Sequence, residues 1–209
     1  MRLQLALDGT LEESLAVLSL VRPYIDIAEV GTPLIYREGM AAVWQIRQAY
    51  PDITLTADLK IMDAGREEAL IAFEAGSDIV TILGVAPDPT IRHAAAVADD
   101  LGKAVMADML QVTDMSLRGL ALHQMGCHYL CLHTAYDLQR TQPISSNYLL
   151  QGRIDLAGLP FAIAGGINLQ NIESVLAISP EIIIVGSAIT RAVHPAEAAQ
   201  ALYDRIHSL

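Results

Sequence analysis

Charged side chains follow several short apolar runs of the sequence, near the point where each run ends. In chain order these residues are Asp8, Glu29, Asp58, Lys60, Asp108 and His133. Carboxylates that lie close together repel one another unless a cation or a lysine neutralises them. Glu29 and Asp58 are hard oxygen ligands that suit a partly hydrated Mg²⁺ ion, and Lys60 can stabilise an oxyanion that develops beside it. His133 is a candidate acid–base, because imidazole exchanges protons near neutral pH.

Any one of these charged residues also has a structural interpretation. A single acid at a strand end can cap the following helix or pair with a lysine, and a lone histidine is often structural. The set as a whole favours function, because burying this many charges for structure alone is costly. Asp63 follows Lys60 closely, and its position fits a helix cap and a catalytic neighbour equally well. Asp108 has three interpretations: a partner of Lys60, a partner of His133, or a structural acid.

Eight short apolar runs recur along the chain, and most gaps between them can hold a helix. Runs this short suit strands better than helices. The runs are Leu3–Leu7, Ile25–Val30, Ile53–Ala57, Ile79–Leu83, Ala104–Met109, Tyr129–Leu132, Phe161–Ala164 and Ile182–Val185. Helical periodicity predicts helices over Leu11–Val21, Gly39–Tyr50, Arg66–Ala75, Thr90–Leu101, Met115–Met125, Leu169–Ile178 and Pro195–Ile206. Residues 144–156 have room for one short helix.

Strands that alternate with helices predict parallel pairing and right-handed crossovers. Eight such units predict an α/β fold, a compact (β/α)8 TIM barrel, with residues 1–209 as a single domain. The alternative is an open doubly wound sheet, but no Gly-x-Gly-x-x-Gly motif follows the first run. The active site of a barrel lies at the C-terminal ends of its strands. The acids, Lys60 and His133 are therefore expected to meet at one mouth.

Glycines follow the last two runs. Gly165 and Gly166 follow the seventh run, and Gly186 and Ser187 follow the eighth. Glycine lets backbone N–H groups approach a ligand closely, and a helix that starts there adds a positive dipole. Tight turns that need a positive φ are the alternative explanation. We expect a phosphate site, because the loops after strands 7 and 8 of a barrel commonly hold a phosphate.

The composition excludes several classes of protein. Hydrophobic residues make up 53% of the 209 residues and charged residues 18%, which excludes a disordered chain. The net charge of −11 repels a phosphate backbone, so we expect no nucleic-acid partner. Cys127 and Cys131 are too few for a disulfide scaffold and are expected to be core thiols. With no membrane-length apolar run and no signal peptide, we expect no membrane partner and a cytoplasmic location.

Six segments of the chain carry a family resemblance. They are Leu5-Ala6-Leu7-Asp8, Glu29-Val30-Gly31-Thr32-Pro33-Leu34, Ala57-Asp58-Leu59-Lys60-Ile61-Met62-Asp63-Ala64-Gly65, Thr81-Ile82-Leu83-Gly84-Val85, Ala164-Gly165-Gly166-Ile167-Asn168 and Val185-Gly186-Ser187-Ala188-Ile189-Thr190. In order, and over essentially the whole chain, they resemble the 3-hexulose-6-phosphate synthases. That family belongs to the orotidine-5′-monophosphate decarboxylase superfamily, together with the 3-keto-L-gulonate-6-phosphate decarboxylases. The Asp-x-Lys-x-x-Asp string is specific to the superfamily, and its context narrows the match to these two branches.

The resemblance implies a Mg²⁺-dependent aldehyde-lyase that joins formaldehyde to D-ribulose 5-phosphate, or reverses that reaction, through a Mg-stabilised enediolate. By the same resemblance Glu29 and Asp58 hold the metal, and Lys60 stabilises a cis-enediolate. His133 moves the proton at C1, and Asp8 contacts the sugar phosphate. Asp63 reaches the active site of a neighbouring subunit, which implies a homodimer.

The sequence departs from the family pattern after His133. The decarboxylases have an arginine three residues past the histidine, where this chain has Tyr136. Ser187 matches the synthases, whereas the decarboxylases usually carry arginine after the glycine. Both differences weigh against a decarboxylase, although Tyr136 and residues 140–153 leave open a different sugar phosphate. A decarboxylase of a 3-keto sugar-acid phosphate and a non-catalytic sugar-phosphate-binding barrel are the competing hypotheses.

Overall fold

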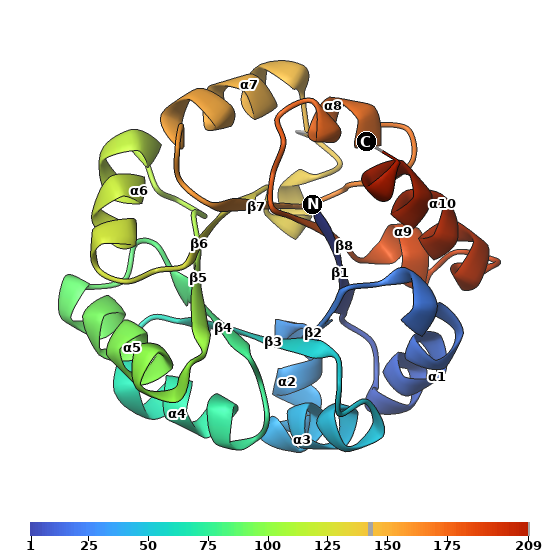
Figure 1. Cartoon of the computed structure of the whole chain (residues 1–209), viewed down its shortest axis with the longest axis horizontal. Helices are drawn as coiled ribbons and strands as arrows, with labels where there is room; N and C mark the ends of the chain where they lie inside the picture. The colour runs from blue at the N-terminus through green and yellow to red at the C-terminus, as the bar shows by residue number, and fades with distance from the viewer. Residues whose placement is uncertain (142–143, 209) are drawn as a thin grey trace.

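Eight parallel strands pair in chain order and close into a barrel, with β1 paired to both β2 and β8 (Figure 1). The computed structural model describes residues 1–141 and 144–208. The strands are β1 (Arg2–Leu7), β2 (Ile27–Val30), β3 (Thr54–Ile61), β4 (Ile79–Leu83), β5 (Ala104–Asp108), β6 (Tyr129–His133), β7 (Phe161–Ala164) and β8 (Ile182–Val185). All eight predicted strands are present, so the predicted TIM barrel is confirmed and the open sheet is wrong.

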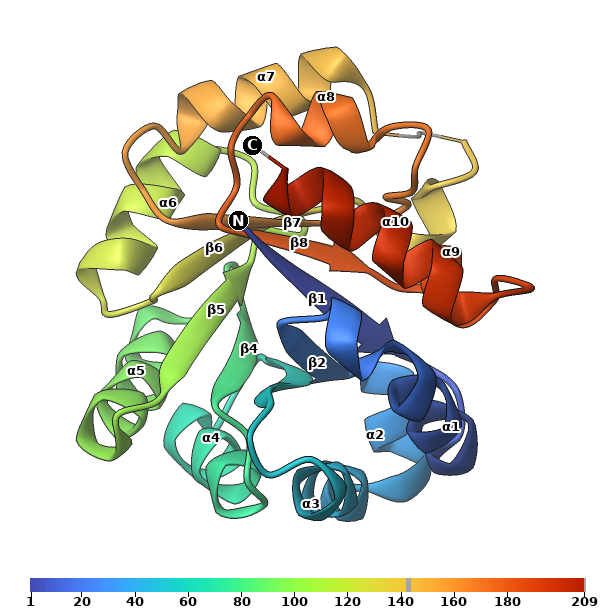
Figure 2. The same cartoon turned by 45° about the vertical axis from the view of Figure 1, so that its right-hand side comes forward.

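Helices surround the barrel and cover its outer face (Figure 1). They are α1 (Leu11–Val21), α2 (Thr32–Glu38), α3 (Met40–Ala49), α4 (Gly65–Glu74), α5 (Asp88–Leu101), α6 (Met115–Gln124), α7 (Ser146–Asp155), α8 (Ile172–Leu176), α9 (Ser187–Thr190) and α10 (Pro195–His207). Two short 3₁₀ turns, η1 (Arg22–Tyr24) and η2 (Tyr136–Leu138), complete the described elements. Figure 2 shows α10 beside α1 and α8, which it contacts.

The helix predictions hold with three exceptions, one of which is α9, a four-residue helix that lies in no predicted range. The pattern did not predict α2, a seven-residue helix with Pro33 in its first turn, which ends at Gly39 with φ 61°. Helix α8 is shorter than the predicted Leu169–Ile178, because the chain turns through Asn168 and Asn171 before the helix begins. Helix α7 occupies the predicted 144–156 region, while residues 142 and 143 of the 140–153 segment lie outside the described residues.

Side chains pack on both faces of the sheet. The larger core lies between strands and helices, and a smaller cluster fills the barrel interior with residues such as Ile27, Met106 and Ile184. Cys127 and Cys131 are both buried, as predicted. Within the described part of the chain, every helix is too short or too polar to cross a bilayer.

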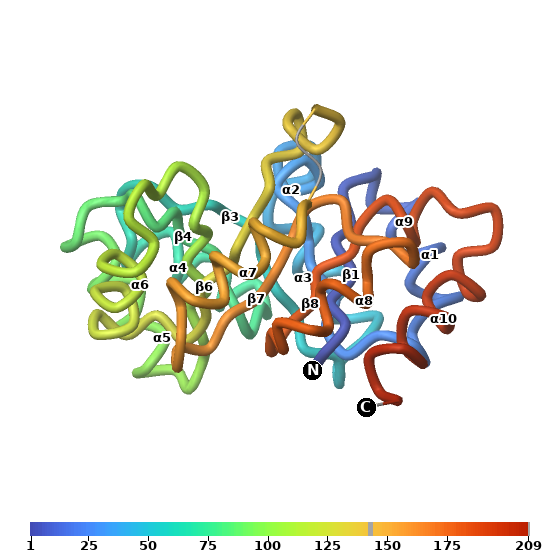
Figure 3. Tube along the Cα trace, turned by 90° about the horizontal axis from the view of Figure 1, so that it is seen from above, coloured from blue at the N-terminus to red at the C-terminus, as the bar shows by residue number. Residues whose placement is uncertain are grey.

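The two ends of the barrel differ in character. Figure 3 shows both chain termini at one end and α2 at the other. At the end where the strands begin, the Asp78 carboxylate accepts hydrogen bonds from Arg47 at 2.5 Å, from Lys103 at 2.6 Å and from the Leu55 N–H at 2.9 Å. Burial alone would raise the pKa of Asp78, but these donors outweigh it and lower the pKa. This cluster links strands on the side of the barrel away from the candidate site.

Candidate active site

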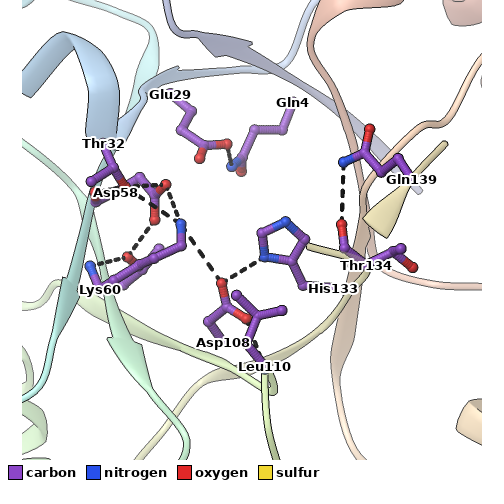
Figure 4. Close-up of polar contacts among 11 residues, drawn as sticks. Gln4, Glu29, Thr32, Asp58, Lys60, Asp108, Leu110, His133, Thr134 and Gln139 are labelled. Carbon is purple, nitrogen blue, oxygen red and sulfur yellow. Dashed lines mark hydrogen bonds and ion pairs between the residues drawn. The ribbon is translucent and has the colours of Figure 1, made fainter. Parts of the chain in front are cut away.

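The centre of the site is a lysine paired with a buried carboxylate. Lys60 Nζ lies 2.5 Å from Asp58 Oδ2, and Asp58 is only 7% exposed (Figure 4). Burial favours the neutral form of each group, but the mutual attraction is stronger. It lowers the pKa of Asp58, and together with Asp108 it raises the pKa of Lys60. Both groups are therefore ionised at neutral pH, with the ammonium at the mouth of the barrel.

Both residues lie in an irregular stretch of β3. The pairing of β3 with β4 shifts between Ala57 and Ile61, so the stretch that includes Asp58 and Lys60 bulges. Within it Lys60 has φ 49°, a left-handed conformation that costs a non-glycine residue about 1–3 kcal/mol. The Lys60 N–H donates to Thr81 Oγ1 at 2.9 Å, and that hydroxyl donates to Asp58 Oδ1 at 2.7 Å. Thr81 thus contacts both residues across the strand pair.

A second threonine contacts the other oxygen of the same carboxylate. Thr32 Oγ1, in the first turn of α2, lies 2.8 Å from Asp58 Oδ2 and 2.7 Å from the Asp58 carbonyl oxygen. It also accepts from Lys60 Nζ at 3.4 Å. Each oxygen of Asp58 therefore has a threonine partner, which orients the carboxylate.

Glu29 lies on the neighbouring strand β2 and is also 7% exposed. Its Oε2 accepts from Gln4 Nε2 at 2.6 Å. Burial and the Asp58 charge raise the pKa of Glu29 to about 8, although the Gln4 hydrogen bond opposes the shift. The Lys60 charge also acts to lower this pKa, but burial and Asp58 outweigh it, and a bound cation would favour the ionised form of Glu29.

His133 faces the same region from the end of β6 (Figure 4). Its Nδ1 lies 2.8 Å from Asp108 Oδ2, and Asp108 Oδ1 accepts from the Leu110 N–H at 3.0 Å. In the tautomer whose Nδ1–H donates to this carboxylate, Nε2 keeps the lone pair of a neutral imidazole. Asp108 Oδ2 is also 3.7 Å from Lys60 Nζ. Asp108, only 3% exposed, is therefore a partner of both groups and not a structural acid remote from the site.

Asp8 is an exposed residue at the mouth, just past the end of β1. Partial burial and the Asp58 charge raise its pKa, against the pull of Lys60. A Cβ on Gly31 would lie 2.1 Å from Asp8 Oδ1, so only glycine lets the carboxylate lie at this point. Gly186, after β8, is on the other side of Asp8: its Cβ would lie 3.8 Å from Oδ2.

The predicted phosphate loops follow β7 and β8. Gly165 has φ 104° and Gly166 has φ 73°, so the turn geometry does require glycine. Among the residues that the structure describes, the backbone N–H groups of Gly165, Gly166, Gly186 and Ser187 have no protein acceptor. Gln139 donates from Nε2 to the Thr134 carbonyl at 3.2 Å (Figure 4). Its side chain also lies beside Gly166. Free N–H groups in two adjacent loops suit an anion.

Asp63 lies apart from the mouth of its own barrel. It is exposed, and its Oδ1 accepts from the next N–H, that of Ala64, at 2.8 Å. Helix α4 begins after Ala64 without a side-chain cap, so the capping explanation for Asp63 is wrong. In the described structure Asp63 contacts neither Lys60 nor Glu29.

The structure thus brings together five of the predicted residues: Glu29, Asp58, Lys60, Asp108 and His133. Asp8 borders them, and the glycines lie on adjacent loops. Sequence reasoning missed Gln4, Thr32 and Thr81, which orient the acids. Gln4 shares the inward face of β1, and Thr32 and Thr81 lie in the motifs that carry the resemblance. No group of three or more His, Cys, Asp or Glu side chains gathers as a metal site within residues 1–141 and 144–208.

Comparisons with known proteins agree over the whole chain. The profile of the orotidine 5′-phosphate decarboxylase / HUMPS family matches residues 1–202. A 3-hexulose-6-phosphate synthase of Bacillus subtilis (strain 168) is 40% identical over 207 residues, which cover 99% of this chain and 99% of that protein.

Two solved structures have the same fold. The structure of 3-hexulose-6-phosphate synthase from Salmonella typhimurium is 38% identical, with TM-score 0.95, and the match covers 100% of this chain and 99% of that one. That of 3-keto-L-gulonate-6-phosphate decarboxylase from Vibrio cholerae O1 biovar El Tor is 31% identical, with TM-score 0.89, and covers 99% and 97% of the two chains. The identity is higher to the synthases than to the decarboxylase.

Proposed function

We propose that this chain, which belongs to the orotidine 5′-phosphate decarboxylase / HUMPS family and is a lyase, joins formaldehyde to D-ribulose 5-phosphate to give 3-hexulose 6-phosphate, reversibly. The observation that carries the proposal is the contact of one buried acid, Asp108, with both His133 and Lys60. Asp108 thereby holds the imidazole of His133 close to the ammonium of Lys60. Removing a proton from the carbon next to a carbonyl needs both a base and a positive charge that stabilises the oxyanion.

The chemistry assigned to these residues starts at C1 of the sugar. The Nε2 atom of His133 takes a proton from C1, and the electron pair moves through C2 onto the ketone oxygen. Lys60 stabilises the resulting enediolate, because its ammonium remains charged beside Asp58. The enediolate oxygen then re-forms the C2 carbonyl, and the C1–C2 π electrons form the new bond to the formaldehyde carbon. The carbonyl electrons move to the formaldehyde oxygen, which takes the proton back from His133.

The acids of the site fit a Mg²⁺ ion. Mg²⁺ is commonly bound by one or two carboxylates, with waters and substrate oxygens completing its shell. Glu29 and Asp58 would supply these two carboxylates, and a cation would offset the burial and the Asp58 repulsion that raise the pKa of Glu29. The ion would supply Lewis-acid polarisation of substrate oxygens. Loss of activity with a chelator, restored by Mg²⁺, is the expected result; full activity in the chelator would contradict it.

The sugar phosphate is assigned to the loops after β7 and β8. Within the described part of the chain, the N–H groups of Gly165, Gly166, Gly186 and Ser187 have no protein acceptor, so they can bind an anion in a protein of net charge −11 without using lysine. Asp8 borders these loops and is assigned to a sugar hydroxyl. This places the phosphate on one side of the mouth and the reacting carbons near His133.

Assembly as a homodimer accounts for Asp63. Its carboxylate is exposed and points to no charged partner in its own described chain. We assign it to the mouth of a second copy, where it would pair with the partner's Lys60. A two-fold axis would then give each of the two sites one Asp63 from the other subunit.

The experiment is a labelling assay. Ribulose 5-phosphate and ¹³C-formaldehyde are incubated with the enzyme and Mg²⁺, and the product is followed by NMR. The expected product carries the label at C1 of a hexulose phosphate, because the new bond joins formaldehyde to the old C1. His133→Asn, purified identically, controls for contaminating activity. No labelled sugar from the wild-type enzyme would refute the proposed function.

A further inference from the structure

We propose that Thr81 is a positioning residue, whose hydroxyl holds Asp58 and the backbone of Lys60 in their working arrangement at the same time. The inference rests on the proposed function, because it gives Lys60 and Asp58 their roles. Thr81 lies in β4, opposite the bulge of β3, and is 5% exposed.

The hydroxyl makes two hydrogen bonds of opposite sense. It accepts from the Lys60 N–H at 2.9 Å, and it donates to Asp58 Oδ1 at 2.7 Å. A hydroxyl can do both, since it has one proton and two lone pairs. A methyl group in its place would leave the Lys60 N–H and one oxygen of a buried carboxylate without these partners.

The bond to the backbone has a particular consequence at Lys60. This residue has φ 49°, a conformation that persists only where the surroundings impose it. The register with β4 shifts between Ala57 and Ile61, so Lys60 has no regular cross-strand partner to impose this conformation. The hydrogen bond to Thr81 is therefore the side-chain contact to which we assign the backbone conformation of Lys60.

Thr32 offers a close comparison. It also hydrogen-bonds the Asp58 carboxylate, and it touches Lys60 only at Nζ, 3.4 Å away. Replacing Thr32 thus removes bonds to the carboxylate and the backbone carbonyl of Asp58, but no bond to the backbone of Lys60. The proposal assigns the backbone conformation of Lys60 to Thr81 and not to Thr32.

The kinetic test uses Thr81→Val, which keeps the shape and removes the hydroxyl, and Thr81→Ser, which keeps it. Misplacing a catalytic group by about 1 Å can cost about 10²-fold in rate. We expect a loss of kcat of about this size in Thr81→Val, with KM for ribulose 5-phosphate nearly unchanged because the phosphate loops are distant. Thr81→Ser should retain most of the activity. Thr54→Val, on the same barrel face but at the opposite end of β3, is the matched control and should behave as wild type.

Crystal structures of the variants provide a readout that does not depend on activity. Lys60 should return to negative φ in Thr81→Val and keep positive φ in Thr81→Ser and Thr32→Val. Thr81→Ala replaces Thr81→Val if the valine variant does not fold. Wild-type kcat together with positive φ in Thr81→Val would overturn the proposal. If the wild-type enzyme forms no hexulose phosphate, the proposed function fails instead, and the φ of Lys60 alone then decides the role of Thr81.

Discussion

Alanine at Gly165 and at Gly166 should have very different effects, although the two glycines are adjacent and both have positive φ. A Cβ on Gly166 would meet Gln139 Oε1 at 3.5 Å, an ordinary contact, so its cost is the left-handed backbone, about 1–2 kcal/mol. A Cβ on Gly165 would lie 2.4 Å from the Thr134 carbonyl oxygen and 3.0 Å from the Thr134 nitrogen. That overlap is with backbone, and relieving it adds about 1–3 kcal/mol to the strain.

These energies predict which of the two variants has the lower Tm and which has the lower kcat. At about 2–4 °C per kcal/mol for a chain of this size, Gly166→Ala should lower Tm by about 2–8 °C and Gly165→Ala by about 4–20 °C. Gly166→Ala should raise KM for the sugar phosphate more than it lowers kcat, because the phosphate is bound equally in ground and transition states. Gly165→Ala should also lower kcat, because it displaces Thr134, the neighbour of His133.

The assays are thermal unfolding and steady-state kinetics on both purified variants. A Tm for Gly165→Ala equal to or above that of Gly166→Ala would refute the steric argument. A fall in kcat alone for Gly166→Ala would refute the phosphate assignment.

His133→Asn should abolish exchange of the C1 proton of ribulose 5-phosphate with D₂O while phosphate affinity, measured by isothermal titration calorimetry, stays near wild type; exchange at the wild-type rate would remove His133 from the mechanism. Mixing inactive Asp63→Ala with inactive Glu29→Ala should restore activity, because one site of each heterodimer receives both intact groups, and failure in demonstrated heterodimers would show that Asp63 serves its own subunit. Asp78→Asn should lower the free energy of unfolding near pH 7 by about 1–2 kcal/mol. The effect is modest because the cluster is partly exposed and solvent screens its charges. Because the folded pKa of Asp78 is lowered, its contribution is present above the unfolded value of about 3.9 and is lost as pH falls through the folded pKa. The free energies of urea unfolding of the two proteins should therefore converge as pH falls, and a difference that does not shrink with acidification would contradict the assignment.

The residues at the ends of the apolar runs could be placed from the sequence for two reasons. Side chains alternate between the two faces of a strand, and the strand–helix units of a barrel repeat along the chain. Glu29, Asp58 and His133 needed only the rule that parallel strands end at one mouth. The three interpretations of Asp108 were separable only by distance, since 2.8 Å to His133 and 3.7 Å to Lys60 depend on the closure of the barrel.

The bulge in β3 could not be predicted from the sequence pattern. Periodicity ended that strand at Ala57, whereas the strand continues to Ile61 with Lys60 at positive φ. A bulge depends on the register of the neighbouring strand, and one strand's own pattern does not contain that register. For the same reason the contacts of Thr81 were missed, although Thr81 was part of a noted segment. Helix α2 was missed because its seven residues are too few for a clear helical period.

The central claim is that Lys60 and His133 act on an enediolate that attacks formaldehyde, and not on one formed by loss of CO₂. The most direct test compares kcat/KM for ribulose 5-phosphate plus formaldehyde with kcat/KM for 3-keto-L-gulonate 6-phosphate, each with and without Mg²⁺. We expect the formaldehyde reaction to have the higher kcat/KM and to require Mg²⁺. A higher kcat/KM for the keto-gulonate substrate would contradict this claim and identify the chain as a decarboxylase.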